Sequence, residues 1–189
     1  GVGAKSAQRM AFHLLDKDRE GASRLVETLG EAASRVHHCD RCRMLTEETR
    51  CGFCTSGRRD GTLLCVVESP ADVLAVEQSG AYSGRYFVLM GHLSPIDGIG
   101  LKELGLDLLE ERFAEKSISE VVVATSVTVE GDATAHIVAT MARRHQIRAS
   151  RIAYGVPLGG ELEFIDGGTL SRAMTGRRDM EIDATEETQ

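Results

Sequence analysis

Four cysteines in two close pairs are the feature that most restricts what this chain can fold into. Cys39 and Cys42 form one C-x2-C pair, and Cys51 and Cys54 form a second pair after a spacer of eight residues. Two such pairs supply four thiolates, which can bind Zn²⁺ tetrahedrally at S–Zn distances of about 2.3 Å. The spacing predicts a structural zinc site, because four protein ligands leave no position for a substrate. The alternatives are two disulfides or four unrelated cysteines.

The residues around these pairs fit a metal-binding knuckle. Nearby arginines are expected to favour the ionised thiols, namely Arg41, Arg43 and Arg50. His37 and His38 lie just upstream and offer an alternative ligand. They are expected instead to be solvent-facing residues at a helix end, since the cysteines already complete the ligand set. The knuckle has few apolar residues of its own, so zinc is expected to supply its stability.

Composition describes an ordinary chain with an uneven charge. Of its 189 residues, 42% are hydrophobic and 27% are charged. No apolar run approaches the ~20 residues of a membrane span, and no signal peptide opens the sequence, so we expect a cytoplasmic protein without membrane contact. The net charge of −7 argues against a generally basic nucleic-acid binder. Residues 1–60, however, hold 11 Lys and Arg against 9 Asp and Glu, and local patches decide phosphate binding.

The N-terminal residues have the pattern of a phosphate-binding turn. Gly1 and Gly3 form a turn that leads into an amphipathic helix from Lys5, and Lys5 and Arg9 share one helix face. A glycine turn at a helix N-terminus presents free N–H groups to a phosphate. Gly1, Gly3, Lys5 and Arg9 are therefore the predicted DNA contact, as the second half of a helix-hairpin-helix whose first helix would precede residue 1. The alternative for the first three residues is a frayed terminus. A second amphipathic helix is expected over residues 22–36.

From residue 61 onward, strands and helices alternate, which predicts a parallel sheet with crossover helices. We expect strands at residues 63–67, 86–90, 120–124 and 152–154, and helices at residues 71–78, 106–114 and 133–145. Cys65 is expected to be buried in the first of these strands. Ligands of open parallel sheets collect at the carboxyl ends of the strands.

Acidic residues gather at those predicted strand ends. Glu68, His92, Asp97, Glu130 and Asp132 all follow strands. Such a cluster can hold Mg²⁺ for phosphoryl-transfer chemistry. The alternative is a set of solvated loop carboxylates, with Glu68 capping the helix that follows it. His92 is expected to be a hydrogen-bonding loop residue rather than a catalytic base.

The order of these parts resembles the RecR family of bacterial recombination mediators. The matching segments are residues 1–3 and 5–9, the four cysteines, and residues 66–72, 84–89, 91–95 with 97–98, 128–131 and 155–163. The resemblance implies a Toprim fold over residues 61–158 and a Walker-B-like acidic stretch at residues 162–166, with Glu163 and Asp166. It also implies a ring-shaped homotetramer that works with RecO and RecF to load RecA onto single-stranded DNA coated by single-strand-binding protein.

Several positions depart from the family and Toprim patterns. Ala4 stands where proline is common, and Ser126-Val127 stands where Asn-Pro is usual. No Asp-x-Asp follows the strand at residues 120–124, which argues against nuclease or topoisomerase chemistry. We therefore expect a non-enzymatic protein that binds single- and double-stranded DNA. The resemblance also implies that Glu130 and Asp132 lie in a loop that contacts RecO. The rival is a Mg²⁺-dependent Toprim nuclease or primase-like enzyme that uses Glu68, Glu130 and Asp132.

The expected fold has several parts and combines α+β with α/β architecture. A truncated helix-hairpin-helix and a helix occupy residues 1–37, and a four-cysteine zinc finger occupies residues 38–60. A Toprim domain with a mostly parallel sheet follows over residues 61–158. Residues 159–189 form a short C-terminal segment, with a disordered acidic end from residue 181.

Overall fold

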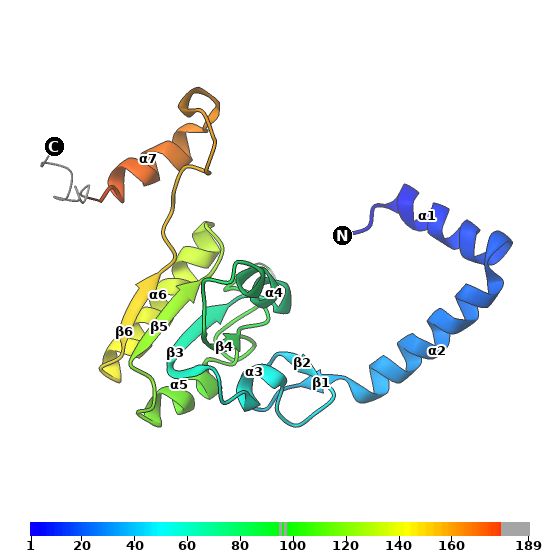
Figure 1. Ribbon diagram of the computed structural model, residues 1–189, viewed down its shortest axis with the longest axis horizontal. Coiled ribbons are helices and arrows are strands. Elements are labelled where there is room, and N and C mark those ends of the chain that lie inside the picture. The colour runs from blue at the N-terminus through cyan, green and yellow to red at the C-terminus, as the bar shows by residue number, and fades with distance from the viewer. Residues whose placement is uncertain (95, 97, 179–189) are drawn as a thin grey trace, which may run out of the picture. The chain divides into compact units, whose positions relative to one another are not determined.

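The computed structural model describes residues 1–94, 96 and 98–178 (Figure 1). The chain divides into two compact units, one spanning residues 1–149 and the other beginning at residue 150. In the part of the chain that is described, no helix is both long enough and apolar enough to cross a membrane.

A four-stranded sheet forms the centre of the first unit. Its order is β4 (Gly84–Val88), β3 (Asp60–Val67), β5 (Glu120–Ala124) and β6 (Arg148–Arg151). The central strand β3 is parallel to both β4 and β5, and its last residue, Val67, pairs with Val88 on one side and Ala124 on the other. Three strands therefore end level with one another, as a parallel sheet with a ligand edge requires.

Helices cover both faces of this sheet. Alternate residues of β3 point to opposite faces, so Leu64 and Val66 join one core cluster while Cys65 and Val67 join another. The first cluster includes α5 (Leu106–Ala114) and α6 (Val129–Arg144), and the second includes Val73 of α4 (Pro70–Gln78). The predicted burial of Cys65 is confirmed, since its side chain is 2% exposed.

The last strand was expected at residues 152–154, and this prediction is wrong. The strand β6 occupies Arg148–Arg151 instead, where no residue is fully buried. The edge strand is polar and lacks the apolar alternation of a buried strand. Ile152 and Tyr154 have that alternation, so the pattern predicted the strand at the wrong residues. Ile152 is in fact 47% exposed.

The N-terminal helices bury none of their own residues. They are α1 (Ala4–Phe12), a π-helical turn η1 (His13–Lys17) and α2 (Arg19–Arg35). Helix α2 begins earlier than predicted because the carboxylate of Asp18 accepts the Gly21 amide at 2.8 Å and so caps the helix. Apolar side chains on these helices remain exposed in the chain, including Met10, Leu25 and Leu29.

The cysteine-bearing segment is a small hairpin followed by one helical turn. Strand β1 (His37–His38) pairs antiparallel with β2 (Leu45–Thr46), and α3 (Gly52–Thr55) follows. His37 and His38 are exposed, as expected, but they lie in a strand rather than at a helix end.

The second unit contains a 3-10 helix, η2 (Leu162–Phe164), and a helix, α7 (Gly167–Thr175). Sequence patterns predicted only a short polar tail here. Asp166 begins α7, because its carboxylate accepts the Thr169 amide at 2.9 Å and the Thr169 hydroxyl at 2.6 Å. The predicted disordered acidic end, residues 181–189, lies outside the described residues.

Candidate metal centre and acidic edge

The four knuckle cysteines come together at one point. Their sulfur atoms all lie within 4.8 Å of one another, and Sγ of Cys42 is 3.3 Å from Sγ of Cys51. Cys39, Cys42 and Cys51 are buried and Cys54 is half-buried. All four are free thiols in the structure, which favours a metal site over the alternative of two disulfides. This donor set fits a tetrahedral thiolate site for a soft divalent cation.

Local backbone hydrogen bonds aim the sulfurs inward. The amide of Cys39 donates to the carbonyl of Met44 at 2.8 Å, and the amide of Arg43 donates back to the carbonyl of Cys39 at 2.9 Å. The Cys51 amide donates to Sγ of Cys39 at 3.3 Å, which ties the second pair to the first. A sulfur that accepts an amide hydrogen is stabilised as the thiolate that a metal needs.

The pKa values of the thiols shift in different directions. The hydrogen bond with Cys42, aided by the positive charge of Arg112, lowers the pKa of Cys54 to about 6. Burial raises the pKa of Cys51. A metal that binds here replaces the protons held between the sulfurs. The cation that lowers this pKa, Arg112, lies in α5. Of the arginines beside the cysteines, Arg41 does interact with the thiols, because Cys54 and Cys39 add to the rise in its pKa that the Glu115 hydrogen bond mainly causes.

Most of the knuckle arginines instead attach the knuckle to the sheet domain. Arg41 forms an ion pair with Glu115, and Arg59 forms one with Glu77. Arg59 also stacks over the ring of Phe53, with its guanidinium carbon 4.9 Å from the ring centre. The amide of Val88, at the end of β4, donates to the carbonyl of Cys42 at 2.9 Å.

Apolar contacts complete this attachment. Met44 and Phe53 pack against the cysteine cluster and also against the sheet core around Tyr86. The ring of Phe53 meets Tyr86 edge-on, with centroids 5.6 Å apart. The knuckle therefore draws packing from the sheet domain, beyond what its own few apolar residues provide.

At the carboxyl end of β3, Glu68 is almost completely enclosed. It is 8% exposed, and both carboxylate oxygens accept hydrogen bonds from Ser126. His92 lies nearby, with Nδ1 3.6 Å from Oε2 of Glu68. The alternative in which Glu68 caps the next helix is wrong, because α4 is capped by a reciprocal pair of hydrogen bonds between Ser69 and Asp72.

Glu130 and Asp132 were expected in a loop, and this is also wrong. Helix α6 begins at Val129, because the Thr128 hydroxyl accepts the Gly131 amide at 3.0 Å, so both acids lie in its first turn. Gly131 is needed where it stands, since an added Cβ would collide with the carbonyl of Ser126 and lie 3.1 Å from Glu68.

The acids at this edge do not form a cluster of three metal-binding side chains. Among the described residues, the four cysteines are the only group of three or more metal-binding side chains that converge. Glu68, Glu130 and Asp132 therefore do not converge as the enzymatic alternative requires. Asp97 lies outside the described residues.

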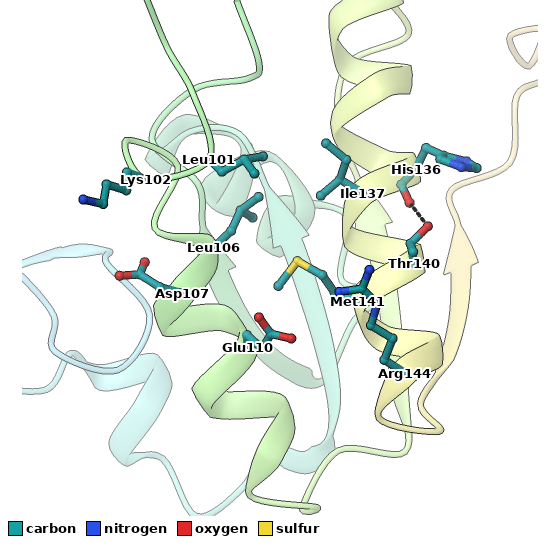
Figure 2. Close-up of a pocket in the computed structure, with 10 residues that line it drawn as sticks. All are labelled: Leu101, Lys102, Leu106, Asp107, Glu110, His136, Ile137, Thr140, Met141 and Arg144. Carbon is teal, nitrogen blue, oxygen red and sulfur yellow. Dashed lines mark hydrogen bonds between the residues drawn. The ribbon is translucent and has the colours of Figure 1, made fainter.

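An apolar groove between α5 and α6 was not predicted (Figure 2). It has a volume of about 570 Å³, and the side chains of Leu106 and Met141 point into it from facing helices. Glu110 and Arg144 stand at its charged rim. No sequence motif marks this groove, because its lining is drawn from two helices and the segment before α5.

The predicted DNA-contact residues are all exposed. Gly3 precedes α1 in extended conformation, with no side-chain cap, and its carbonyl accepts the amides of Ser6 and Ala7 at 3.0 Å. Lys5 and Arg9 are exposed on this helix. In the Walker-B-like stretch, Glu163 is exposed in η2, and the Asp166 carboxylate caps α7.

Comparison with known proteins matches these parts in the same order. The family described as "RecR, helix-hairpin-helix" matches residues 1–33, the Toprim domain matches residues 62–153, and "RecR, C-terminal" matches residues 155–178. The cysteine knuckle lies between the first two matches. A curated relative, "Recombination protein RecR" of Saccharophagus degradans, is 56% identical over 180 residues, which cover 95% of this chain and 91% of the relative. This chain therefore belongs to the RecR family.

Proposed function

We propose that this chain is a non-enzymatic, DNA-binding mediator of recombinational DNA repair that acts in the cytoplasm. It works with RecO and RecF to load RecA onto single-stranded DNA coated by single-strand-binding protein. Similarity to a recombination protein over 95% of the chain is the observation that carries this proposal. The exposed phosphate-binding turn and the enclosed Glu68 both favour binding over catalysis.

DNA contact is assigned to Gly1, Gly3, Lys5 and Arg9. Both cations are exposed, and in the described part of the chain neither forms an ion pair that would neutralise it. The main-chain amides at the start of α1 add the positive end of the helix dipole. These groups meet phosphate rather than base edges, so binding to single- and double-stranded DNA has no sequence preference.

One Zn²⁺ per chain is assigned to Cys39, Cys42, Cys51 and Cys54, in a structural role. The closeness and burial of the sulfurs support this assignment. The ion would cross-link the β1–β2 hairpin to α3 and supply folding free energy to the knuckle.

Assembly into a tetrameric ring is supported by the uncovered N-terminal helices. Their exposed apolar side chains have no cover within the described chain, and an amphipathic helix is stabilised mainly by burying that face. A ring would bring four copies of the weak DNA contact together and strengthen binding by multivalency.

RecO contact is assigned to Glu130 and Asp132. Glu130 is exposed and lies beside Val129, which is 82% exposed, so an acidic and an apolar group face outward together. Such a surface complements a basic partner surface with an apolar centre.

A RecA-loading assay tests the main proposal. Wild-type protein, added with RecO, is expected to accelerate RecA filament formation on single-stranded DNA coated by single-strand-binding protein. The variant with both Lys5→Ala and Arg9→Ala is expected to accelerate it less. An unchanged rate on adding wild-type protein contradicts the mediator function.

Incubation with labelled DNA and Mg²⁺ tests the enzymatic alternative. We expect no cleavage, because Glu68, Glu130 and Asp132 do not converge as a group of three metal-binding side chains. Cleavage by wild-type protein that disappears in Glu68→Gln would establish a Toprim nuclease instead.

A further inference from the structure

A single arginine of the knuckle binds both ends of the segment that joins β4 to α5. The Arg43 guanidinium donates to the carbonyl of Leu89 at 2.9 Å, just after β4. It also donates to the carbonyl of Glu103 at 3.0 Å and to that of Leu104, just before α5. Three carbonyls from two distant chain positions therefore converge on one side chain.

Only an arginine suits this arrangement, and the surrounding backbone is shaped around it. A guanidinium offers five N–H donors in a fixed plane, whereas a lysine offers one compact ammonium. Arg43 has a left-handed backbone, with φ of 64°, which is uncommon for a residue with a side chain. Gly105 also has φ of 64°, and a Cβ at that position would collide with the Arg43 guanidinium.

The same turn holds the metal-binding thiols. Arg43 directly follows Cys42, and its amide donates to the carbonyl of Cys39 at 2.9 Å. The direction of the Arg43 side chain is therefore set by the turn that places Sγ of Cys39 and of Cys42. A metal that fixes this turn also fixes the guanidinium.

Two of the carbonyls that Arg43 binds, those of Glu103 and Leu104, adjoin one wall of the α5–α6 groove. Leu101 and Lys102 precede these two residues, and Leu106 and Asp107 follow them at the start of α5 (Figure 2). The amide of Gly105 donates to the carbonyl of Lys102 at 2.9 Å, which continues the turn into the helix.

We propose that Arg43 is a positioning residue that couples occupancy of the cysteine site to the start of α5, and thereby to the shape of the groove. With metal bound, the knuckle turn is rigid and the guanidinium holds Leu89, Glu103 and Leu104 in place. Without metal, the turn loosens and the α5 wall of the groove loosens with it. The coupling rests on the proposed metal site, but the Arg43 contacts themselves can be tested separately.

Amide hydrogen exchange on the full chain as purified tests the Arg43 contacts. The amides of Leu104, Gly105 and Leu106 are expected to exchange about tenfold faster in Arg43→Ala than in wild type, because the carbonyls lose a charged donor. In Arg43→Lys, the exchange rates of these amides are expected to lie between those of wild type and Arg43→Ala. Arg58→Ala is the matched control, since Arg58 is an exposed knuckle arginine. Equal exchange in Arg43→Ala and Arg58→Ala overturns the proposal.

Zinc release tests the coupling from the opposite end. Coupling between two sites is reciprocal, so Gly105→Ala, which pushes on the guanidinium, is expected to release zinc to a chelator several-fold faster. Gly57→Ala is the control, because a Cβ there meets nothing within 4 Å. Release at the wild-type rate from Gly105→Ala overturns the coupling. If wild-type protein contains no zinc, the metal assignment fails, whereas the exchange result still decides whether Arg43 holds the segment.

Discussion

Ser126 holds the carboxylate of Glu68 from a strand end 58 residues away in sequence. Its amide donates to Oε1 at 3.0 Å, and its hydroxyl donates to Oε2 at 2.6 Å. A carboxylate that is 8% exposed needs such donors, because an unpaired buried charge is costly. The contact joins the ends of β3 and β5 and gives each oxygen of Glu68, one of the three acids of the enzymatic alternative, a hydrogen-bond donor.

Ser126→Ala removes one of the two donors and is expected to lower the free energy of unfolding by roughly 1–3 kcal/mol. The amide contact survives in this variant, so the fold should be retained. Urea denaturation followed by circular dichroism measures the change. Ser34→Ala is the control, because the Ser34 hydroxyl bonds only a carbonyl of its own exposed helix at 2.8 Å. A loss no larger than that of the control would show that Glu68 is stable without the hydroxyl.

Cys42→Ala is expected to release the metal and unfold the knuckle, because three ligands bind Zn²⁺ poorly and the small hairpin depends on the cross-link. Elemental analysis of purified protein and amide exchange over residues 37–55 measure the two effects. Cys65→Ala is the matched control, since that buried thiol lies in β3, outside the sulfur cluster. Wild-type protein without zinc, or full zinc retention in Cys42→Ala, contradicts the assignment.

Local sequence patterns were most accurate where apolar periodicity and turn residues agree. The helix predicted at residues 106–114 and the strand predicted at residues 120–124 have the predicted bounds. The thiol cluster was also predictable, because two short C-x2-C turns determine most of its geometry. Helix α7 was missed because it is only nine residues long and opens with Gly167 and Gly168, which read as a turn, although Leu170, Ala173 and Met174 follow helical spacing.

Contacts between distant residues could not be predicted in the same way. Arg43 was expected to act on the adjacent thiols, but its partners lie at residues 89, 103 and 104. Ser126 was noted only as a departure from a family pattern, although it is the partner of Glu68. No local pattern encodes either contact, because both depend on how knuckle, strands and loops pack.

Glu77→Gln tests the ion pair that attaches Arg59 of the knuckle to α4. The hydrogen bond with Arg59 lowers the pKa of Glu77 and raises that of Arg59, so the two directions agree. A depressed folded-state pKa stabilises the fold above the unfolded value of about 4.3, and this contribution is lost as pH falls through the folded pKa. The variant should therefore be less stable than wild type at pH 7, by roughly 1 kcal/mol.

Urea denaturation as a function of pH measures this difference. The gap between wild type and Glu77→Gln should be constant above about pH 5 and close as pH falls further. Taking the difference removes the acid sensitivity of the thiol site, which both proteins share. Glu48→Gln, at an exposed position near β2, is the control. If the difference in unfolding free energy between wild type and Glu77→Gln does not change with pH, the ion pair does not cause that difference.

Glu130→Lys is expected to weaken RecO binding about tenfold or more, because it reverses the charge of an exposed group facing a basic partner. The fold and metal content should be unchanged, since the Thr128 cap of α6 does not involve the Glu130 side chain. A binding titration with RecO measures the effect. Glu48→Lys makes the same charge change on the knuckle and is expected to leave RecO affinity unchanged. Equal affinities for the two variants would remove Glu130 from the RecO contact.

The variant with both Lys5→Ala and Arg9→Ala should bind every DNA sequence more weakly and depend less on salt. Each phosphate neutralised contributes roughly 0.9 to the slope of log affinity against log salt on duplex DNA, so two lost contacts should flatten the slope by about 1.8 per chain engaged. The acidic remainder of the chain repels DNA, which makes wild-type binding weak and steeply dependent on salt.

Fluorescence anisotropy across a salt series, on several duplex and single-stranded sequences, measures affinity and slope together. The matched control carries Lys17→Ala with Arg24→Ala, two cations of the same helical region that are already paired with Asp16 and Glu20. It removes the same formal charge while leaving the α1 N-terminus intact, so its slope should stay close to wild type. Equal slopes for both double variants would show that net charge, rather than the Gly1–Arg9 turn, governs DNA binding. The exposed knuckle arginines Arg50 and Arg58 would then be the next candidates for the phosphate contact.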